Sequence, residues 1–473
     1  MTVVHALKWS FLAELASKAI TPIVFIVLTR LLTPEDFGVM SAALMVIAFT
    51  QIFWEAGMGK ALIQRQTDVE DAANVAFWVN LCLGFLIAGL LFWGAQPIAI
   101  TFFQDARVTA VLQVMTLQVI LGALSSVQTA LLQKEMNFKK LFWVRSTTVA
   151  FPGLASIPLA WSGMGYWALV AGSLTGQITH VLMLWRMSSW RPALRFPMGV
   201  ARPMGKFGAW VGASGLLAWG YAWVDSLVVG KYLGTHDLGL YRAGNQFVTM
   251  IMVLLFGHIS PVLYSHLSRD NGSVEKLRYH IARVIKAITL CSMPVAIFLY
   301  VYSGYLAKLV FGPDWTGIGF IIAVLGLVSG ISWIVSMNGE VYRAMAKPSY
   351  ETLIMLIAMV IYTPVYLFFI QFGLEVFAWA RLGSVVFGFA CQLYFLGWVL
   401  QFRIDKLLVF ILIYTTICGV IIKANFFMFV RSGDSLLSML TAISLSIVFI
   451  ALSAFELEKR GLAKDIMQFL RGV

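Results

Sequence analysis

Ionisable side chains inside long apolar stretches are the residues of this sequence best suited to do chemistry. Glu14 and Lys18 lie in the first stretch, Asp225 and Arg242 near the middle of the chain, and Arg381 further on. A charge at membrane depth costs at least ~3 kcal/mol, so it usually faces a bundle interior or a water-filled cavity. These residues are therefore candidates for binding an anionic ligand, coupling to ions or gating.

The first apolar stretch carries one continuous polar stripe. Ser10, Glu14, Ser17, Lys18 and Thr21 recur at helical spacing, and Glu14 stands four residues before Lys18, as an intrahelical ion pair requires. Two interpretations remain open. The stripe either packs a self-neutralised pair against a neighbouring helix, or it forms the wall of a cavity that handles phosphate or couples ions.

The charged residues near the middle of the chain favour a structural gate. Asp225 could pair with Arg242, and a structural gate is the preferred interpretation, with ligand or proton contact as the alternative. Glu340 and Arg343 end a serine-containing polar stripe on a later apolar segment. Arg381 has no evident partner within its own predicted helix.

Apolar segments recur from one end of the sequence to the other. The 473 residues are 60% hydrophobic and 12% charged, whereas soluble proteins carry about 25% charged residues. A membrane span needs about 20 apolar residues. Hydropathy predicts about fourteen spans, at 9–30, 37–56, 74–95, 108–131, 141–161, 165–185, 207–230, 240–263, 281–302, 317–342, 350–371, 375–398, 407–424 and 435–455. The sequence therefore predicts an all-α integral membrane protein.

The distribution of charge predicts an orientation. A formal net charge of +12 would suggest a nucleic-acid partner in a soluble protein. Here most Lys and Arg residues fall in alternate short loops, as the positive-inside rule describes for cytoplasmic loops. An even number of spans then places both termini in the cytoplasm, and no nucleic-acid partner is expected.

An internal repeat divides the spans into two halves. Residues 30–39 (RLLTPEDFGV) match residues 231–240 (KYLGTHDLGL) without a gap, and residues 102–105 weakly match 310–314. Each copy of the longer motif stands at the outer turn between the first and second helix of six. The repeat is therefore parallel, with a pseudo-twofold axis along the membrane normal.

The predicted architecture is two six-helix bundles around a central cavity, followed by two more helices. The bundles and connections are a first bundle at 1–185, a basic cytoplasmic linker at 186–206, a second bundle at 207–398, two additional spans at 399–455 and a cytoplasmic tail at 456–473. Within the motif, Pro34 fits a first helical turn, and Asp36 and Asp237 can cap helices. Turn chemistry is therefore favoured over direct ligand contact for the motif.

The sequence resembles the Wzx-type polysaccharide flippases of the multidrug/oligosaccharidyl-lipid/polysaccharide (MOP) exporter superfamily. The resemblance rests on residues 30–39, 55–59 (EAGMG) and 225–234 (DSLVVGKYLG), and it covers nearly the whole chain. It implies translocation of an undecaprenyl-diphosphate-linked repeat unit across the bacterial inner membrane, by alternating access coupled to an ion gradient. It also leaves room for polysaccharide polymerase and chain-length proteins as partners.

The implied cargo suggests roles for individual residues. A diphosphate favours Arg and Lys, whereas sugars favour amides, hydroxyls and aromatic surfaces. Predicted substrate contacts are Lys18, Arg145, Arg343 and Arg381 for phosphate and Gln128 and Gln246 for sugar. Gating or ion coupling is predicted for Glu14, Asp225, Arg242 and Glu340.

Other functions fit the sequence less well. A membrane glycosyltransferase or polymerase would need a carboxylate or metal-binding cluster, but the sequence has no DxD pair and no HExxH motif. We therefore expect no enzyme activity, metal or cofactor. A cation-coupled multidrug exporter would share the fold, although the turn motif and the two extra helices favour the polysaccharide branch. A structural scaffold would not explain the intramembrane charges.

Overall fold

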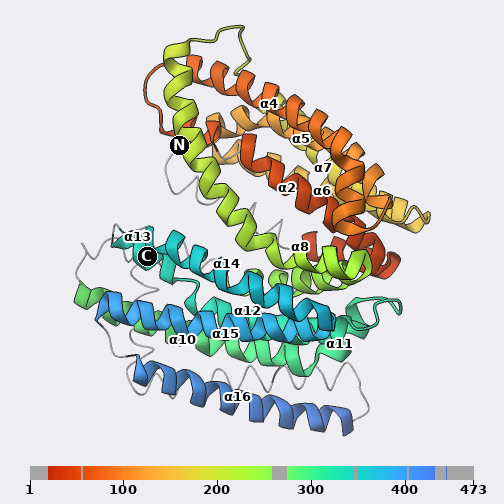
Figure 1. The fold of residues 1–473 in the computed structure, drawn as a ribbon, viewed down its shortest axis with the longest axis vertical. Helices are drawn as coiled ribbons and strands as arrows, with labels where there is room; N and C mark the ends of the chain where they lie inside the picture. Colours follow the sequence, from red (N-terminus) through yellow and green to blue (C-terminus); the bar gives the residue numbers. More distant parts are fainter. Residues whose placement is uncertain are drawn as a thin grey trace. The chain divides into compact units, whose positions relative to one another are not determined.

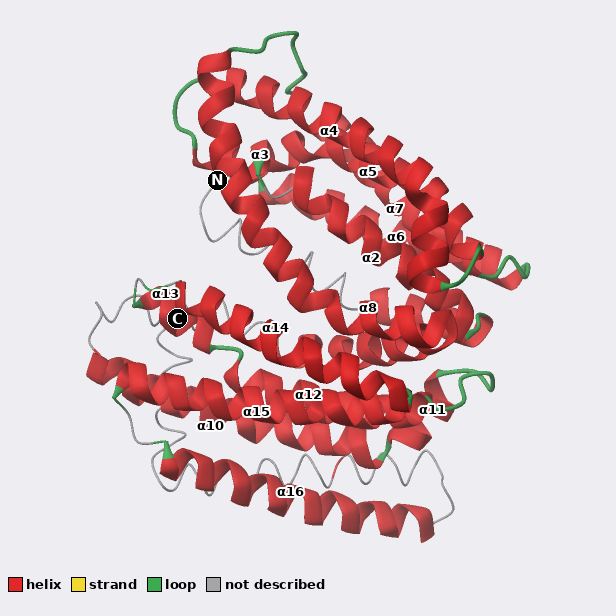
Figure 2. Cartoon of the chain, viewed as in Figure 1, coloured by secondary structure: helices red, strands yellow, loops and turns green. Residues whose placement is uncertain are grey.

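The computed structural model consists of helices and connecting turns, with no strand among the residues that it describes (Figure 2). These are residues 20–54, 57–257, 274–345, 347, 349–401, 404–431 and 444. Within these ranges, ten helices are long and apolar enough to cross a membrane. The prediction of an all-α membrane protein is thereby confirmed. The last predicted span, 435–455, lies outside the described residues apart from residue 444.

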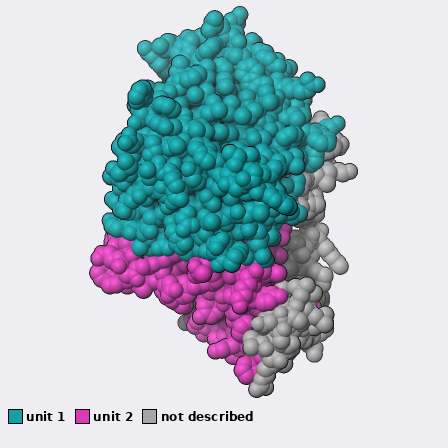
Figure 3. Space-filling model, turned by 90° about the vertical axis from the view of Figure 1, so that its right-hand side faces the viewer, with its two compact units in different colours: residues 1–243, 310–315 teal, residues 244–309, 316–473 magenta. Residues whose placement is uncertain are grey.

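The chain forms two compact units (Figure 3). Unit 1 comprises residues 1–243 and 310–315, and unit 2 comprises residues 244–309 and 316–473. The helices of unit 1 are Ile20–Leu31, α2 (Pro34–Trp54), α3 (Met58–Gln64), α4 (Val69–Ile98), the π-helical turn η1 (Ala99–Phe103), α5 (Arg107–Lys134), α6 (Phe138–Trp161) and α7 (Tyr166–Met187). Helix α8 (Met198–Phe256) belongs to unit 1 up to Ala243 and to unit 2 from Gly244.

Unit 2 contains the remaining described helices. They are α10 (Val274–Val301), α11 (Ser303–Val310, whose last residue belongs to unit 1), α12 (Ile318–Val335), α13 (Asn338–Ala344), α14 (Ser349–Phe369), the 3₁₀ turn η3 (Ile370–Phe372), α15 (Leu374–Leu400) and α16 (Asp405–Arg431). Helix α12 packs against both α10 and α15, and α10 also packs against α16, as Figure 1 shows.

Small residues allow neighbouring helices to approach closely in both units. In unit 1, Gly84 of α4 faces the methyl group of Ala123 on α5. In unit 2, Gly330 of α12 faces Ala296 of α10. Helices in a membrane gain little from the hydrophobic effect, so such close van der Waals packing is a main source of their association.

The structure adds detail to three of the predicted spans. The predicted spans at 207–230 and 240–263 correspond to two helices that join within α8 at a kink at Gly234 (φ 84°, ψ −172°), and residues 258–263 lie outside the described residues. That backbone conformation is accessible almost only to glycine. The predicted span at 317–342 corresponds to one candidate span, Ile318–Arg343, in which a turn at residues 336–337 separates α12 from α13. Ser336 lies in this turn and its hydroxyl donates to the carbonyl of Trp333, a local bond that competes with the helix ladder.

Candidate functional site: a cluster of turns in unit 1

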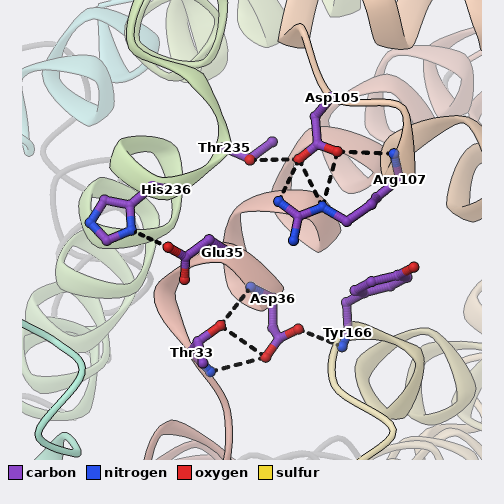
Figure 4. Close-up of polar contacts among 8 residues, drawn as sticks. All are labelled: Thr33, Glu35, Asp36, Asp105, Arg107, Tyr166, Thr235 and His236. Atoms are coloured by element: carbon purple, nitrogen blue, oxygen red, sulfur yellow. Dashed lines mark hydrogen bonds and ion pairs between the residues drawn. The ribbon is translucent and has the colours of Figure 1, made fainter.

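Five short segments meet at one end of unit 1 and form the turn cluster, defined here as residues 25–39, 102–107, 165–166, 230–240 and 310–315. Figure 4 shows its polar contacts. The segments include both copies of the repeated motif and both copies of the weaker match. The turn cluster therefore joins parts of the chain that are about 200 residues apart, and it does so within one compact unit.

Asp36 fixes the start of α2 and ties it to α7. Its Oδ2 accepts hydrogen bonds from the backbone N–H (3.0 Å) and the hydroxyl (3.1 Å) of Thr33, and its own N–H points to that hydroxyl at 3.4 Å. This is a reciprocal capping box with Pro34 in the first turn. Its Oδ1 accepts from the N–H of Tyr166 at 2.8 Å. The capping role predicted for Asp36 is confirmed.

Two glycines bring the copies of the motif into backbone contact. The carbonyl oxygen of Thr235 occupies the position where a Cβ on Gly38 would lie. In the same way, the carbonyl oxygen of Pro34 occupies the Cβ position of Gly239. No side chain fits at either position, because overpacking of this kind forces backbone shifts. The predicted close packing at these glycines is therefore present, and it joins one copy of the motif to the other.

Asp105 holds the second contact between distant segments. Its Oδ2 accepts from the Thr235 hydroxyl at 2.7 Å and from Arg107 Nη2 at 2.7 Å. Burial alone would raise the pKa of the Asp105 carboxyl, but the bonds from Arg107 and Thr235 outweigh burial and hold the pKa below its ordinary value. The carboxylate is therefore ionised whenever the contact with Thr235 is made near neutral pH.

The turn at 310–315 closes over the end of the first described helix. The carbonyl of Val310 accepts from Arg30 Nε at 3.1 Å, and Trp315 Nε1 donates to the carbonyl of Leu32 at 3.1 Å. The rings of Phe37 and Trp315 meet edge to face at 5.2 Å. Polar and aromatic contacts thus hold this turn against the first copy of the motif.

Asp225 and Arg242 both contact Ser226. Asp225 is 7% exposed and accepts hydrogen bonds from the Tyr241 hydroxyl at 2.8 Å and from the N–H and hydroxyl of Ser226. Arg242 lies 4.1 Å above the ring of Trp223, and its Nη1 donates to the Ser226 hydroxyl at 3.5 Å. The structure thus brings the two predicted gating residues together at Ser226, from the two helices that meet at Gly234 within α8, and their role in gating remains a prediction.

Arg343 is held by two carboxylates of unit 2. Its guanidinium donates to both oxygens of Glu351, at 3.0 and 2.8 Å, and to both oxygens of Glu340, at 3.3 and 3.2 Å. A diphosphate would therefore have to displace at least one carboxylate to bind this arginine. The predicted contact of Arg343 with phosphate and the predicted role of Glu340 in gating remain predictions.

The other predicted site residues are spread over the chain. Arg145 and Gln246 are exposed, Arg381 is half-buried, and Gln128 is completely buried. Glu14 and Lys18 lie outside the described residues. Within the described ranges, no three His, Cys, Asp or Glu side chains gather into a group that could hold a metal ion.

Gln128 has a structural equivalent that the sequence analysis missed. At the end of α5, the N–H of Glu135 donates to the carbonyl of Leu131, and the N–H of Asn137 donates to the carbonyl of Leu132. At the end of α13, the N–H of Met345 donates to the carbonyl of Val341, and the N–H of Lys347 donates to the carbonyl of Tyr342. These two pairs of bonds correspond at a constant offset of 210 residues. The same offset places Asn338 where Gln128 stands.

Both equivalent amides are buried and have no hydrogen-bond partner among the described residues. Gln128 is 0% exposed and Asn338 is 2% exposed, and in each case both the oxygen and the nitrogen of the amide are unpartnered. A buried amide without a partner costs ~1–3 kcal/mol. The sequence could have revealed this equivalence, because each amide lies near the end of the fourth predicted span of its half. The correspondence is found only when these two spans are aligned with each other.

The fold is that of a known class of membrane transporter. The structure of the lipid II flippase MurJ in an inward closed conformation aligns with 95% of this chain and 99% of its own, with a TM-score of 0.72 and 15% sequence identity. An inward-facing multidrug resistance MATE family transporter of the MOP superfamily aligns with 81% of this chain and 95% of its own, with a TM-score of 0.65 and 12% identity. At these identities the likeness is one of fold alone.

The sequence also places the chain in a family. The model of the family described as polysaccharide biosynthesis protein matches residues 27–319, so the chain belongs to that family. The succinoglycan biosynthesis transport protein ExoT of Rhizobium meliloti (strain 1021) is 24% identical over 330 residues, which are 70% of this chain and 67% of ExoT. The family expected from the motifs is thereby confirmed.

Proposed function

We propose that this protein is a flippase that moves undecaprenyl-diphosphate-linked oligosaccharide repeat units across the bacterial inner membrane, for the synthesis of exopolysaccharide, capsule or O-antigen. The family match carries the proposal, because it spans the first half of the repeat and much of the second. The transporter fold supports it as well. Both termini lie in the cytoplasm in this proposal, and polymerase and chain-length proteins are further partners.

Transport proceeds by alternating access, with the turn cluster closing the periplasmic side. The charge distribution supports this orientation, since the Arg- and Lys-rich loops lie at the other ends of the same spans. A closure built on backbone contact between Gly38 and Gly239 separates as a whole, because no flexible side chain lies between the two backbones. Glu14, Asp225, Arg242 and Glu340 gate the pathway or couple it to an ion gradient.

Cationic side chains bind the diphosphate and amides bind the sugars. Arg145 is exposed on α6 and offers five donors to phosphate oxygens. The sequence around it, residues 136–154, contains no Asp or Glu that would compete for these donors. Lys18, Arg343 and Arg381 are the other phosphate contacts. Gln128 and Gln246 contact the sugars.

The nearest rival function is multidrug export, since a multidrug transporter has the same fold. The family match favours polysaccharide synthesis over drug export. The rival also predicts a different phenotype, because loss of a drug exporter sensitises cells to drugs and leaves lipid-linked glycans unchanged.

Deletion of the gene tests the proposal. We expect undecaprenyl-diphosphate-linked repeat units to accumulate in the cytoplasmic leaflet, where a membrane-impermeant glycosidase added to intact spheroplasts does not reach them. The wild-type gene on a plasmid should restore both export and glycosidase access. Normal glycan export together with new drug sensitivity would overturn the proposal in favour of the rival.

A further inference from the structure

Glu35 and His236 occupy the same position in the two copies of the repeat, and they bond to each other. The gap-free match of residues 30–39 with 231–240 aligns them. Nδ1 of His236 lies 2.6 Å from Oε1 of Glu35 (Figure 4). In a twofold arrangement, a residue meets its own equivalent only on the axis. The local pseudo-twofold axis of the repeat therefore passes between these two side chains.

The glycine contact obeys the same symmetry. Gly38 is equivalent to Gly239, and Pro34 is equivalent to Thr235. The carbonyl of Thr235 abuts Gly38, and the carbonyl of Pro34 abuts Gly239. The contact is thus reciprocal, as in the isologous interface of a symmetric dimer, although both sides belong to one chain.

The flanking turns repeat the symmetry once more. Arg30 is equivalent to Lys231, and each is contacted by a turn from the other half of the repeat. Arg30 Nε donates to the carbonyl of Val310 at 3.1 Å, and Gln104 Nε2 donates to the carbonyl of Lys231 at 3.4 Å. These two bonds join equivalent segments with the roles of side chain and backbone exchanged, so the local axis is defined by the Glu35–His236 bond and the reciprocal glycine contact.

A residue on a pseudo-twofold axis contacts its equivalent from the other copy, so the charges of the two side chains must be compatible. Two identical acids there would repel each other, and like charges in direct contact are destabilising. The two copies have diverged at this position into one acid and one base, while both kept the glycine one turn further on. The acid and the base at this position are complementary, so the contact between the two copies is favourable rather than repulsive.

We propose that Glu35 and His236 form an axial latch that holds the periplasmic side closed and that separates when this side opens. The proposal rests on the proposed function for its direction of transport. The side chains are 38% and 43% exposed, and exposed ion pairs contribute only modestly, so the latch shifts the ratio of closed to open molecules by about two- to fivefold. A weak latch suits a contact that must open in every cycle.

An exchange of the two residues tests the latch, because symmetry predicts that the pair works in either direction. The full chain, with its four native cysteines replaced, carries spin labels at Ser162 and Tyr232, which are exposed positions of unit 1. Electron paramagnetic resonance distances in lipid nanodiscs without cargo then give the closed fraction. The variants are Glu35→His, His236→Glu and the double exchange, with Glu70→His as control. Glu70 is an exposed acid in the first turn of α4, and Glu35 is a partly exposed acid in the first turn of α2.

The closed-to-open ratio should fall by about two- to fivefold in His236→Glu, fall less in Glu35→His, and return to the wild-type value in the double exchange, with no change in the control. Folding of the double exchange where a single variant fails to fold would equally support the pair. A double exchange no better than His236→Glu, or single variants that leave the ratio unchanged, would overturn the latch. Because the measurement contains no cargo, a negative result would overturn the latch but not the flippase proposal. A negative result in the deletion test would overturn the flippase proposal but would not change the measured closed fraction.

Discussion

The turn cluster and the two buried amides handle polar groups in opposite ways. Asp36 and Asp105 each accept several hydrogen bonds, and one bond to each comes from a distant segment, from Tyr166 to Asp36 and from Thr235 to Asp105. The side chains of Gln128 and Asn338, which occupy equivalent positions on α5 and α13, make none with the residues that the structure describes. The turn cluster therefore stabilises the fold in this conformation, whereas the amides cost free energy there. Substitutions in the two regions should accordingly differ in size and in sign.

The largest effect is expected for Gly38→Leu. The added side chain would have to displace the Thr235 carbonyl, and overpacking of this kind costs ~1–3 kcal/mol or more. We expect a clear loss of thermal stability in detergent and loss of glycan export. Gly212→Ala is the matched control, since nothing lies within 4 Å of its added methyl group. Equal behaviour of the two variants would contradict the backbone contact.

A smaller loss is expected for Asp36→Ala. The change removes the side-chain half of the capping box and the bond to Tyr166 N–H, and loss of a capping residue costs ~1–2 kcal/mol. Glu70→Ala in the first turn of α4 removes only a favourable interaction with the helix dipole and should cost ~0.5 kcal/mol. Thermal unfolding of both variants measures the difference. A smaller loss for Asp36→Ala than for Glu70→Ala would show that the tie to α7 contributes nothing.

Asp105→Asn should destabilise the protein by ~1 kcal/mol near neutral pH, because hydrogen bonds to a charged acceptor are lost. The folded-state pKa of Asp105 lies below its ordinary value. Its contribution is therefore present above the unfolded pKa of about 4 and disappears as the pH falls through the folded-state pKa. The gap in melting temperature between wild type and variant should narrow over that range. A gap that widens with acidification would mean that the carboxyl is bound in its protonated form.

The smallest effect on stability is expected for Gln128→Met and Asn338→Leu. Replacing an unpartnered buried amide by an apolar side chain of similar shape is nearly neutral or stabilising. Unchanged or raised melting temperatures together with impaired export would assign the amides to transport. A loss of stability as large as that of Asp36→Ala would instead show that the amides support the fold, and the contrast with the turn cluster would fail.

Much of the fold was predictable because membrane spans are marked by hydropathy. Predicted spans such as 108–131 and 375–398 fall within α5 and α15, and the capping role of Asp36 followed from local sequence. The contact between Glu35 and His236 was not predictable, since alignment shows which residues are equivalent but not which of them lie on the axis. The interruption at Ser336 was also missed, because hydropathy is insensitive to a local serine bond to the backbone.

The boundary between the halves illustrates the same limit. The repeat predicts a division near residue 206, whereas the compact units divide between Ala243 and Gly244. Residues 230–240 contribute to the turn cluster through Thr235, His236 and Gly239, and these contacts place the first part of α8 in unit 1. The boundary near residue 206 is defined by the similarity of the two repeats in sequence. The boundary at residues 243 and 244 is defined by which residues pack together, so the two need not coincide.

Transport in purified vesicles tests the central claim most directly. The protein is reconstituted into proteoliposomes that contain undecaprenyl-diphosphate-linked oligosaccharide from the producing cells, and a glycosidase added outside measures how much glycan becomes accessible. The account predicts that wild-type protein, under an imposed ion gradient, moves glycan from the inner to the outer leaflet and that Gly38→Leu does not. Equal glycan accessibility in vesicles with wild-type protein, with Gly38→Leu and without protein would contradict it.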